Sequence, residues 1–171
     1  SLGAQVADGR LDIGLSRLLP QGEAVQALSL GEERLVAAVS SESPLARQAS
    51  VNLAQLSAYP LILFPADYGS GLNQSIEQLY RHHGVPLHTG PTGRQITSII
   101  ALVAAGQGVV LLPRVVARGL ERPGVVRLTL KAPDFLRWDI AFIWRQGAYL
   151  SNAAQAWLAL LRERPVSRAE R

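Results

Sequence analysis

The chain has 171 residues, no cysteine and a formal net charge of +4 at pH 7, and 48% of its residues are hydrophobic. This length suits one domain or two small lobes that share a core, and the hydrophobic fraction excludes a largely disordered chain. The lack of cysteine excludes disulfides, thiolate metal sites and cysteine nucleophiles, and it fits a reducing compartment. No apolar run approaches the ~20 residues of a membrane span, and the N-terminus lacks a signal-peptide pattern.

Much of the positive charge lies at the C-terminal end. Four arginines and two glutamates give the last ten residues a net charge of +2, so the rest of the chain is close to balanced. The other arginines are scattered, with no basic stripe and no interleaved aromatic residues. This pattern favours solvated charged faces over direct contact with DNA.

The N-terminal part of the chain predicts a helix followed by several strands. The helix covers residues 2–7 and ends at Asp8-Gly9. Alternating apolar residues predict a strand over 11–15. Two further strands are expected at 25–30 and 35–40, joined by the polar residues Gly31 to Arg34. The polar segment 41–50 is expected to pass from one lobe to another.

The middle of the chain alternates between helical and strand signals. Asn52 predicts the cap of a short helix that ends before Pro60. A buried strand is expected over 61–64, then a turn over 65–71, because two glycines and a proline lie there. A helix over 72–81 and a brief strand over 87–89 follow.

Residues 95–113 form the unit around which the chain is organised. Apolar residues recur at the spacing of one helical face: Ile96, Ile99, Ile100 and Val103. Gly106 or Gly108 is expected to hold a positive φ, because the chain must reverse into a strand within three residues. The apolar run 109–112 then predicts a strand that is buried on both faces.

The last part of the chain predicts one more lobe passage and a strand–helix pair. A helical turn is expected at 114–118, a strand at 125–130 and the passage at 131–134. Alternating aromatic and apolar residues predict a strand over 137–145. A final helix, capped by Ser151 or Asn152, should carry the apolar residues Ala153, Trp157, Leu160 and Leu161.

Strands that alternate with helices predict an α/β fold with largely parallel sheets. In such sheets, ligands bind beyond the carboxyl ends of the strands, where helix N-termini point. Three segments meet this condition: 16–17, 65–71 and 92–97. Ser70 can cap the helix after it, and the flanking glycines leave N–H groups open to a carboxylate. The alternative is that Ser70 and Thr97 only cap helices.

Three stretches, taken in order, resemble the effector-binding domain of LysR-type transcriptional regulators. They are 33–39 followed by 43–46, 59–65 followed by a glycine-rich turn, and VAAGQGVVLLP at 103–113. The resemblance extends from about Leu11 to Trp157, and it is greatest to the branch that senses small aromatic-pathway acids. It implies two Rossmann-like lobes joined by two crossing strands, similar to type 2 periplasmic binding proteins. The lobes would be 1–44 with 135–171, and 45–134.

The resemblance also implies a function and a site. A small effector, either a carboxylate in general or an aromatic carboxylate in particular, would bind in the cleft between the lobes. The family's first lobe starts with a strand and a loop that precede the helix at 2–7. A helix-turn-helix domain lies further upstream, and the regulators assemble as homodimers or tetramers in the cytoplasm without a cofactor. The expected ligand-binding residues are Ser16, Arg17, Pro65, Ala66, Asp67, Tyr68, Gly69, Ser70, Gln95 and Thr97. Arg34 matches an arginine that contacts a second ligand in some relatives; the alternative is surface pairing with Glu32 or Glu33.

Two other classes of function compete with a sensor. A free solute-binding protein would carry an export signal, at least before processing. An enzyme on the same fold finds little support, because Gly69-Ser70-Gly71 is not a Gly-x-Ser-x-Gly elbow. His82, His83 and His88 lack the convergent carboxylates of a metal site, and no phosphate loop or HExxH motif occurs. The sequence upstream of Ser1 would separate a sensor from a solute-binding protein.

Overall fold

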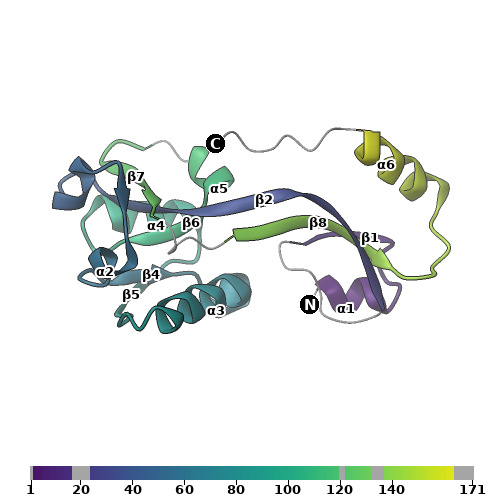
Figure 1. Cartoon of the computed structure of the whole chain (residues 1–171), viewed down its shortest axis with the longest axis horizontal. Coiled ribbons are helices and arrows are strands. Elements are labelled where there is room, and N and C mark those ends of the chain that lie inside the picture. The colour runs from purple at the N-terminus through teal and green to yellow at the C-terminus, as the bar shows by residue number, and fades with distance from the viewer. Residues whose placement is uncertain (1, 17–23, 120–121, 132–136, 164–171) are drawn as a thin grey trace. The chain divides into compact units, whose positions relative to one another are not determined.

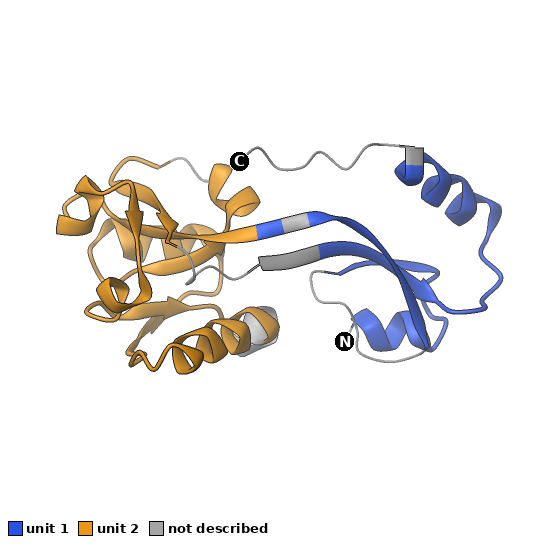
Figure 2. Cartoon of the chain, viewed as in Figure 1, with its two compact units in different colours: residues 1–33, 138–171 blue, residues 34–137 orange. Residues whose placement is uncertain are grey.

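The computed structural model describes residues 2–16, 24–119, 122–131 and 137–163 (Figure 1). The chain separates into two compact units, which Figure 2 shows in blue and orange. Unit 1 comprises residues 1–33 and 138–171, and unit 2 comprises residues 34–137. The predicted lobe boundaries are at 44–45 and 134–135, whereas the first boundary between the two units lies at 33–34, inside a continuous strand. Within the described ranges, no helix has both the length and the apolar character needed to cross a membrane.

Unit 1 contains two helices and the strands that pack with them. Its elements are α1 (Leu2–Ala7), β1 (Ile13–Ser16), the first part of β2 (Val25–Ser40), β8 (Arg137–Arg145) and α6 (Asn152–Glu163). In the strand order, β8 lies between β1 and β2. β1 pairs antiparallel with β8, with Ile13 opposite Trp144. The predicted strand 137–145 is confirmed.

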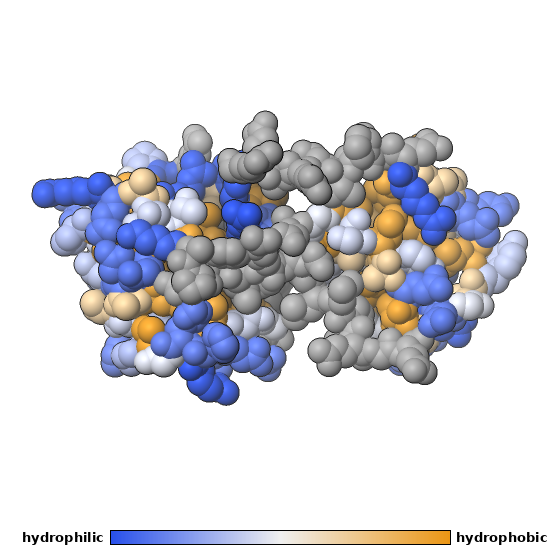
Figure 3. Space-filling view, in the orientation of Figure 1, coloured by the Kyte–Doolittle hydropathy of each residue, from blue (hydrophilic) through white to orange (hydrophobic). Residues whose placement is uncertain are grey.

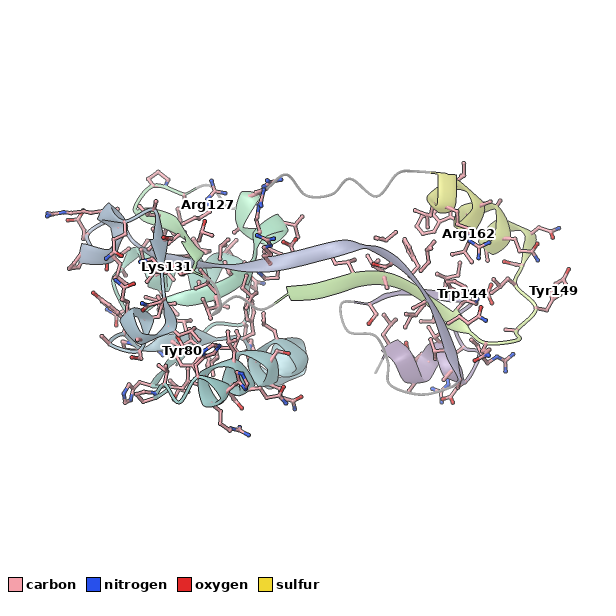
Figure 4. The ribbon with its side chains drawn as sticks, viewed as in Figure 1. Tyr80, Arg127, Lys131, Trp144, Tyr149 and Arg162 are labelled. Atoms are coloured by element: carbon pink, nitrogen blue, oxygen red, sulfur yellow. The ribbon has the colours of Figure 1, made fainter. Side chains whose placement is uncertain are left out.

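Aromatic and apolar side chains of β8 and α6 form the core of unit 1. Phe142, Trp144 and Leu158 are buried together, and Trp144 lies among the side chains of this unit in Figure 4. The predicted final helix is confirmed as α6, and within it Leu158 is buried, whereas Trp157 is 53% and Leu160 61% exposed. Trp157 still meets Phe142 edge to face, with ring centroids 5.0 Å apart. Hydrophobic residues therefore reach the surface of unit 1 (Figure 3).

Unit 2 holds the second part of β2 and most of the remaining elements. In chain order they are η1 (Pro44–Arg47), β3 (Ser50–Val51), α2 (Leu53–Leu56), β4 (Leu61–Leu63), α3 (Ala66–His82), β5 (Thr89–Thr92), α4 (Ile96–Ala104), β6 (Val110–Pro113), α5 (Arg114–Arg118) and β7 (Val125–Leu130). β2 pairs antiparallel with β6 and with β7, while β3 pairs parallel with β7 and β4 parallel with β5. The α/β class is confirmed, but the expectation of largely parallel sheets is wrong.

Three predicted elements of this region differ from the structure. Residues 25–40 form one strand, β2, and not two strands joined by a turn. Gly31, inside this strand, holds a φ of 128°, a backbone conformation that glycine adopts more readily than other residues. Residues 41–50 contain η1 and lie within unit 2. The brief strand predicted at 87–89 lies instead at 89–92.

The predicted helix–turn–strand unit is the core of unit 2. Ile99, Ile100 and Val103 are buried on one face of α4, as their spacing predicts. Gly106 has a φ of 70° and Gly108 a φ of 153°, so the expected positive φ is confirmed at both glycines. β6 is buried at all its positions. It pairs with β2, and Val109, the residue before β6, forms a parallel bridge with Leu61 of β4.

Candidate functional site

Two parallel strands bring two helix N-termini to one edge of unit 2. β4 and β5 pair in parallel, with Leu61 opposite Thr89 and Leu63 opposite Thr92. β4 leads through residues 64–65 into α3, and β5 leads through residues 93–95 into α4. Because the carboxyl ends of parallel strands lie at the same edge, α3 and α4 both begin beyond that edge of the strand pair.

The first of these helices starts earlier than the sequence predicts. A turn over 65–71 is wrong, because α3 begins at Ala66 with Pro65 as its N-cap. Pro65 has a φ of −59°, the value its ring favours and one that suits the residue before a helix. Gly69 and Gly71 lower helix propensity without forbidding a helix, and the buried face further along α3 stabilises it. Ser70 is the fifth helical residue, so it cannot be the cap.

The second helix starts after a tight passage from β5. Gln95 is the N-cap of α4, with a φ of −124° and a ψ of 148°. Thr97 is exposed and is the second residue of the helix, so the reading of Thr97 as a cap is also wrong. A Cβ on Gly93 would lie 2.6 Å from Cγ1 of Ile99. A glycine at this position therefore lets the loop lie directly against α4.

The helix starts at this edge lack side-chain caps. Among the described residues, no side-chain hydrogen bond caps α3 at Pro65 or α4 at Gln95. By contrast, Asn52 and Gln55 form a complete capping box on α2, with bonds of 2.8 and 3.1 Å. The first N–H groups of a helix need a partner and carry partial positive charge. The edge is thus suited to an anion.

Asn73 positions the chain between β4 and α3, and the sequence analysis missed it. Its Nδ2 donates a 2.8 Å hydrogen bond to the carbonyl oxygen of Phe64. Its Oδ1 is buried and has no hydrogen-bond partner in the part of the chain that the structure describes. Asn73 shares a helical face with the buried Ile76 and Tyr80, at spacings of three and seven. A polar residue on this otherwise apolar face of α3 is the sequence signal that could have identified Asn73.

The remaining predicted residues are spread over both units. Ser16 is the half-buried last residue of β1 in unit 1, opposite Ala141 of β8, and Arg17 lies outside the described residues. Arg34 is exposed on β2 in unit 2. The segments 65–70 and 95–97 both follow the paired strands β4 and β5 in unit 2. No group of three or more potential metal ligands occurs among the described residues.

Comparison with known proteins assigns the chain to a family. The family model described as the LysR substrate binding domain matches residues 1–165, so the chain belongs to this family. It is 32% identical over 156 residues to the uncharacterized HTH-type transcriptional regulator YwbI of Bacillus subtilis, covering 90% of this chain and 50% of YwbI. It is 34% identical over 105 residues to the regulator CatR of Pseudomonas putida, covering 61% and 36%. The chain spans about half, or less, of these relatives.

Solved structures show the same fold. The effector binding domain of QuiR in complex with shikimate matches with a TM-score of 0.76 at 21% identity, covering 92% of this chain and 73% of that chain. Full-length BenM matches with a TM-score of 0.81 at 23% identity, covering 94% and 52%. The predicted likeness to type 2 periplasmic binding proteins is confirmed at the level of the fold.

Proposed function

We propose that this chain is the ligand-sensing part of a bacterial LysR-type transcriptional regulator. The ligand would be a small carboxylate bound at the edge where α3 and α4 begin. One observation carries this proposal: the parallel pair of β4 and β5 brings two helix N-termini without side-chain caps to the same edge. Two helix dipoles and several N–H donors favour a compact negative charge there.

The surroundings of this edge suggest what accompanies the carboxylate. Leu63, Phe64 and Pro65 are half-buried and apolar, and they lead directly into α3. A flat, carbon-rich body beside the carboxylate would cover these residues. QuiR, a structural neighbour, binds shikimate, which is a carboxylate on a six-membered ring. An aromatic or cyclic carboxylate is therefore our preferred ligand class.

The role of the whole protein follows from its relatives. We propose that ligand binding changes how a DNA-binding domain outside this chain binds its target. The regulator would act in the cytoplasm as a homodimer or tetramer, and it would not be an enzyme. The named relatives are transcriptional regulators, which disfavours the alternative of a free solute-binding protein. Static light scattering tests the assembly: a monomer at tens of micromolar would contradict it.

A thermal-shift screen of aromatic, cyclic and aliphatic carboxylates tests the ligand class. At a hundredfold excess over Kd, a ligand adds about 2.7 kcal/mol to the free energy of unfolding. For a chain of this size, that is a rise of roughly 5–10 °C in Tm. The matching amides and amines serve as controls for charge. Stabilisation by neutral or cationic compounds alone would show that the anion argument is wrong.

Paired substitutions then locate the site. We expect Ser70→Ala and Thr97→Val to reduce the shift caused by an active carboxylate. Ser75→Ala and Ser98→Ala are matched controls on the same two helices; the Ser75 hydroxyl already donates to the carbonyl of Gly71 at 2.8 Å. If all four variants keep the wild-type shift, the carboxylate binds elsewhere. Ser16→Ala and Arg17→Ala test in the same way whether unit 1 contributes.

A further inference from the structure

A pocket in unit 2 gathers four arginine side chains. Its volume is about 270 Å³, and the arginines come from three elements: Arg34 from β2, Arg114 and Arg118 from α5, and Arg127 from β7. These residues are separated by up to 93 positions, counted from 34 to 127. In the sequence, these arginines are therefore scattered. No residue of the edge between α3 and α4 lines this pocket, so the inference is independent of the proposed carboxylate site.

Strand register explains why Arg34 and Arg114 meet. β2 pairs antiparallel with β6, with Leu35 opposite Pro113. If the same register is extended by one residue, Arg34 lies opposite Arg114. Arg114 is the first residue of α5, directly after β6. One helical turn later, Arg118 follows at i+4 on the same side of α5.

The other neighbour of β2 brings the fourth arginine to the same face. Val36 is opposite Thr129, and Ala38 is opposite Arg127, in the pairing of β2 with β7. Alternate residues of a strand share a face, so Arg127 and Thr129 lie on the face that carries Val36. α5 packs on this face, because its Ala117 belongs to the same buried cluster as Val36.

A hydrogen bond holds Arg127 at the wall of the pocket. Its Nη1 donates to the carbonyl oxygen of Ala117 at 2.9 Å (Figure 4 shows Arg127 on β7). This bond satisfies a carbonyl near the C-terminus of α5 and joins α5 to β7. The planar guanidinium is thereby oriented before any ligand arrives, which reduces the entropy lost on binding.

The charge of the pocket is of one sign. The described residues that line it include four arginines and no aspartate or glutamate. Like charges gathered in one concave site repel one another, and a bound anion removes that repulsion. Guanidinium groups match the oxygens of phosphate in bidentate pairs. The volume of about 270 Å³ lies just below the roughly 300–1,000 Å³ of typical ligand pockets, which restricts the site to a small anion.

We propose that this pocket binds a small multivalent oxyanion, namely inorganic phosphate or a phosphate monoester with a small organic part. Arg114, Arg118 and Arg127 are its principal ligands, and Arg34 closes the rim. The apolar surface of Val36 and Ala117 lies beneath them. A dianion suits four guanidinium groups better than a monocarboxylate does, because its charge is larger and more of its oxygens accept hydrogen bonds.

Calorimetric titration of the whole chain with inorganic phosphate and with glycerol phosphate tests the proposal, with ionic strength held constant by chloride. We expect saturable binding to the wild type. The double variant Arg114→Gln/Arg118→Gln should raise Kd at least about tenfold, since it loses charged hydrogen bonds to the oxyanion at two positions. Arg81→Gln is the matched control, because Arg81 is an exposed arginine of α3 in the same unit. It should bind like the wild type.

The Tm in chloride alone is a second readout. Removing two like charges should leave the double variant at least as stable as the wild type, which separates lost binding from lost folding. The proposal is overturned if the wild type shows no saturable phosphate binding, or if the double variant binds as well as Arg81→Gln. A third titration uses a random DNA duplex: binding of the duplex through these arginines without binding of either phosphate would also overturn it. Ser70→Ala should keep phosphate binding, which separates this pocket from the carboxylate site.

Discussion

The two glycines of the turn before β6 should respond very differently to the same substitution. Both hold a positive φ, 70° at Gly106 and 153° at Gly108. A Cβ on Gly106 would meet no atom within 4 Å, whereas a Cβ on Gly108 would lie 2.3 Å from the carbonyl oxygen of Pro60. That oxygen accepts a 2.9 Å hydrogen bond from the amide of Val109, and the carbonyl of Val109 accepts one of 2.8 Å from Ile62.

The structure sets the size of each effect. Gly106→Ala costs only the strain of the left-handed backbone, about 1 kcal/mol. Gly108→Ala must also push the strand start at Pro60 away from Val109. This disturbs two buried hydrogen bonds, each worth about 1–3 kcal/mol when a partner is left unsatisfied. We therefore expect Gly108→Ala to lower the free energy of unfolding by roughly 3–5 kcal/mol in total.

Urea denaturation followed by circular dichroism measures both variants against the wild type. In a thermal scan, Gly106→Ala should lower Tm by about 2–4 °C, and Gly108→Ala should lower it several times as much or abolish the folded state. Equal destabilisation by the two substitutions would refute the close approach of Pro60. A Gly106→Ala variant that is the less stable of the two would refute the reasoning altogether.

Four further substitutions test other features. Asn73→Ala removes the hydrogen bond to Phe64 and should lower the free energy of unfolding by about 1–3 kcal/mol in urea denaturation. It should also reduce the rise in Tm that an active carboxylate causes. If neither quantity changes, Asn73 does not position the chain between β4 and α3. Asn52→Ala breaks the capping box of α2 and should cost about 0.5–2 kcal/mol. Leu158→Ala should cost about 2–5 kcal/mol, while Leu160→Ala stays within about 0.5 kcal/mol, because Leu158 is buried and Leu160 is 61% exposed. The reverse order would contradict the packing of α6 through Leu158.

Local patterns in the sequence determined most elements of the chain. The helical spacing of Ile99, Ile100 and Val103 predicts the buried face of α4, and the need to reverse within three residues predicts the positive φ of Gly106. The alternation over 137–145 predicts β8. These signals are readable because each depends on residues that are close in sequence and on backbone rules that hold in any fold. The family resemblance is carried by the same stretches.

Tertiary structure decided where the elements begin and what meets across them. α3 starts at Ala66 although two glycines and a proline predict a turn, because packing along a 17-residue helix outweighs the low propensity of its first residues. α6 buries Leu158 and leaves Trp157 53% exposed, since the rotation of a helix about its axis is set by the surface that it packs against.

The arginine pocket shows the limit of the sequence most directly. Arg34, Arg114 and Arg127 carry no local signal, and their convergence depends on the register of β2 with β6 and with β7. Register is a property of two paired strands, fixed by their pairing and packing in three dimensions. The sequence determined which residues could bind an anion, and the pairing of distant strands decided which of them do so together.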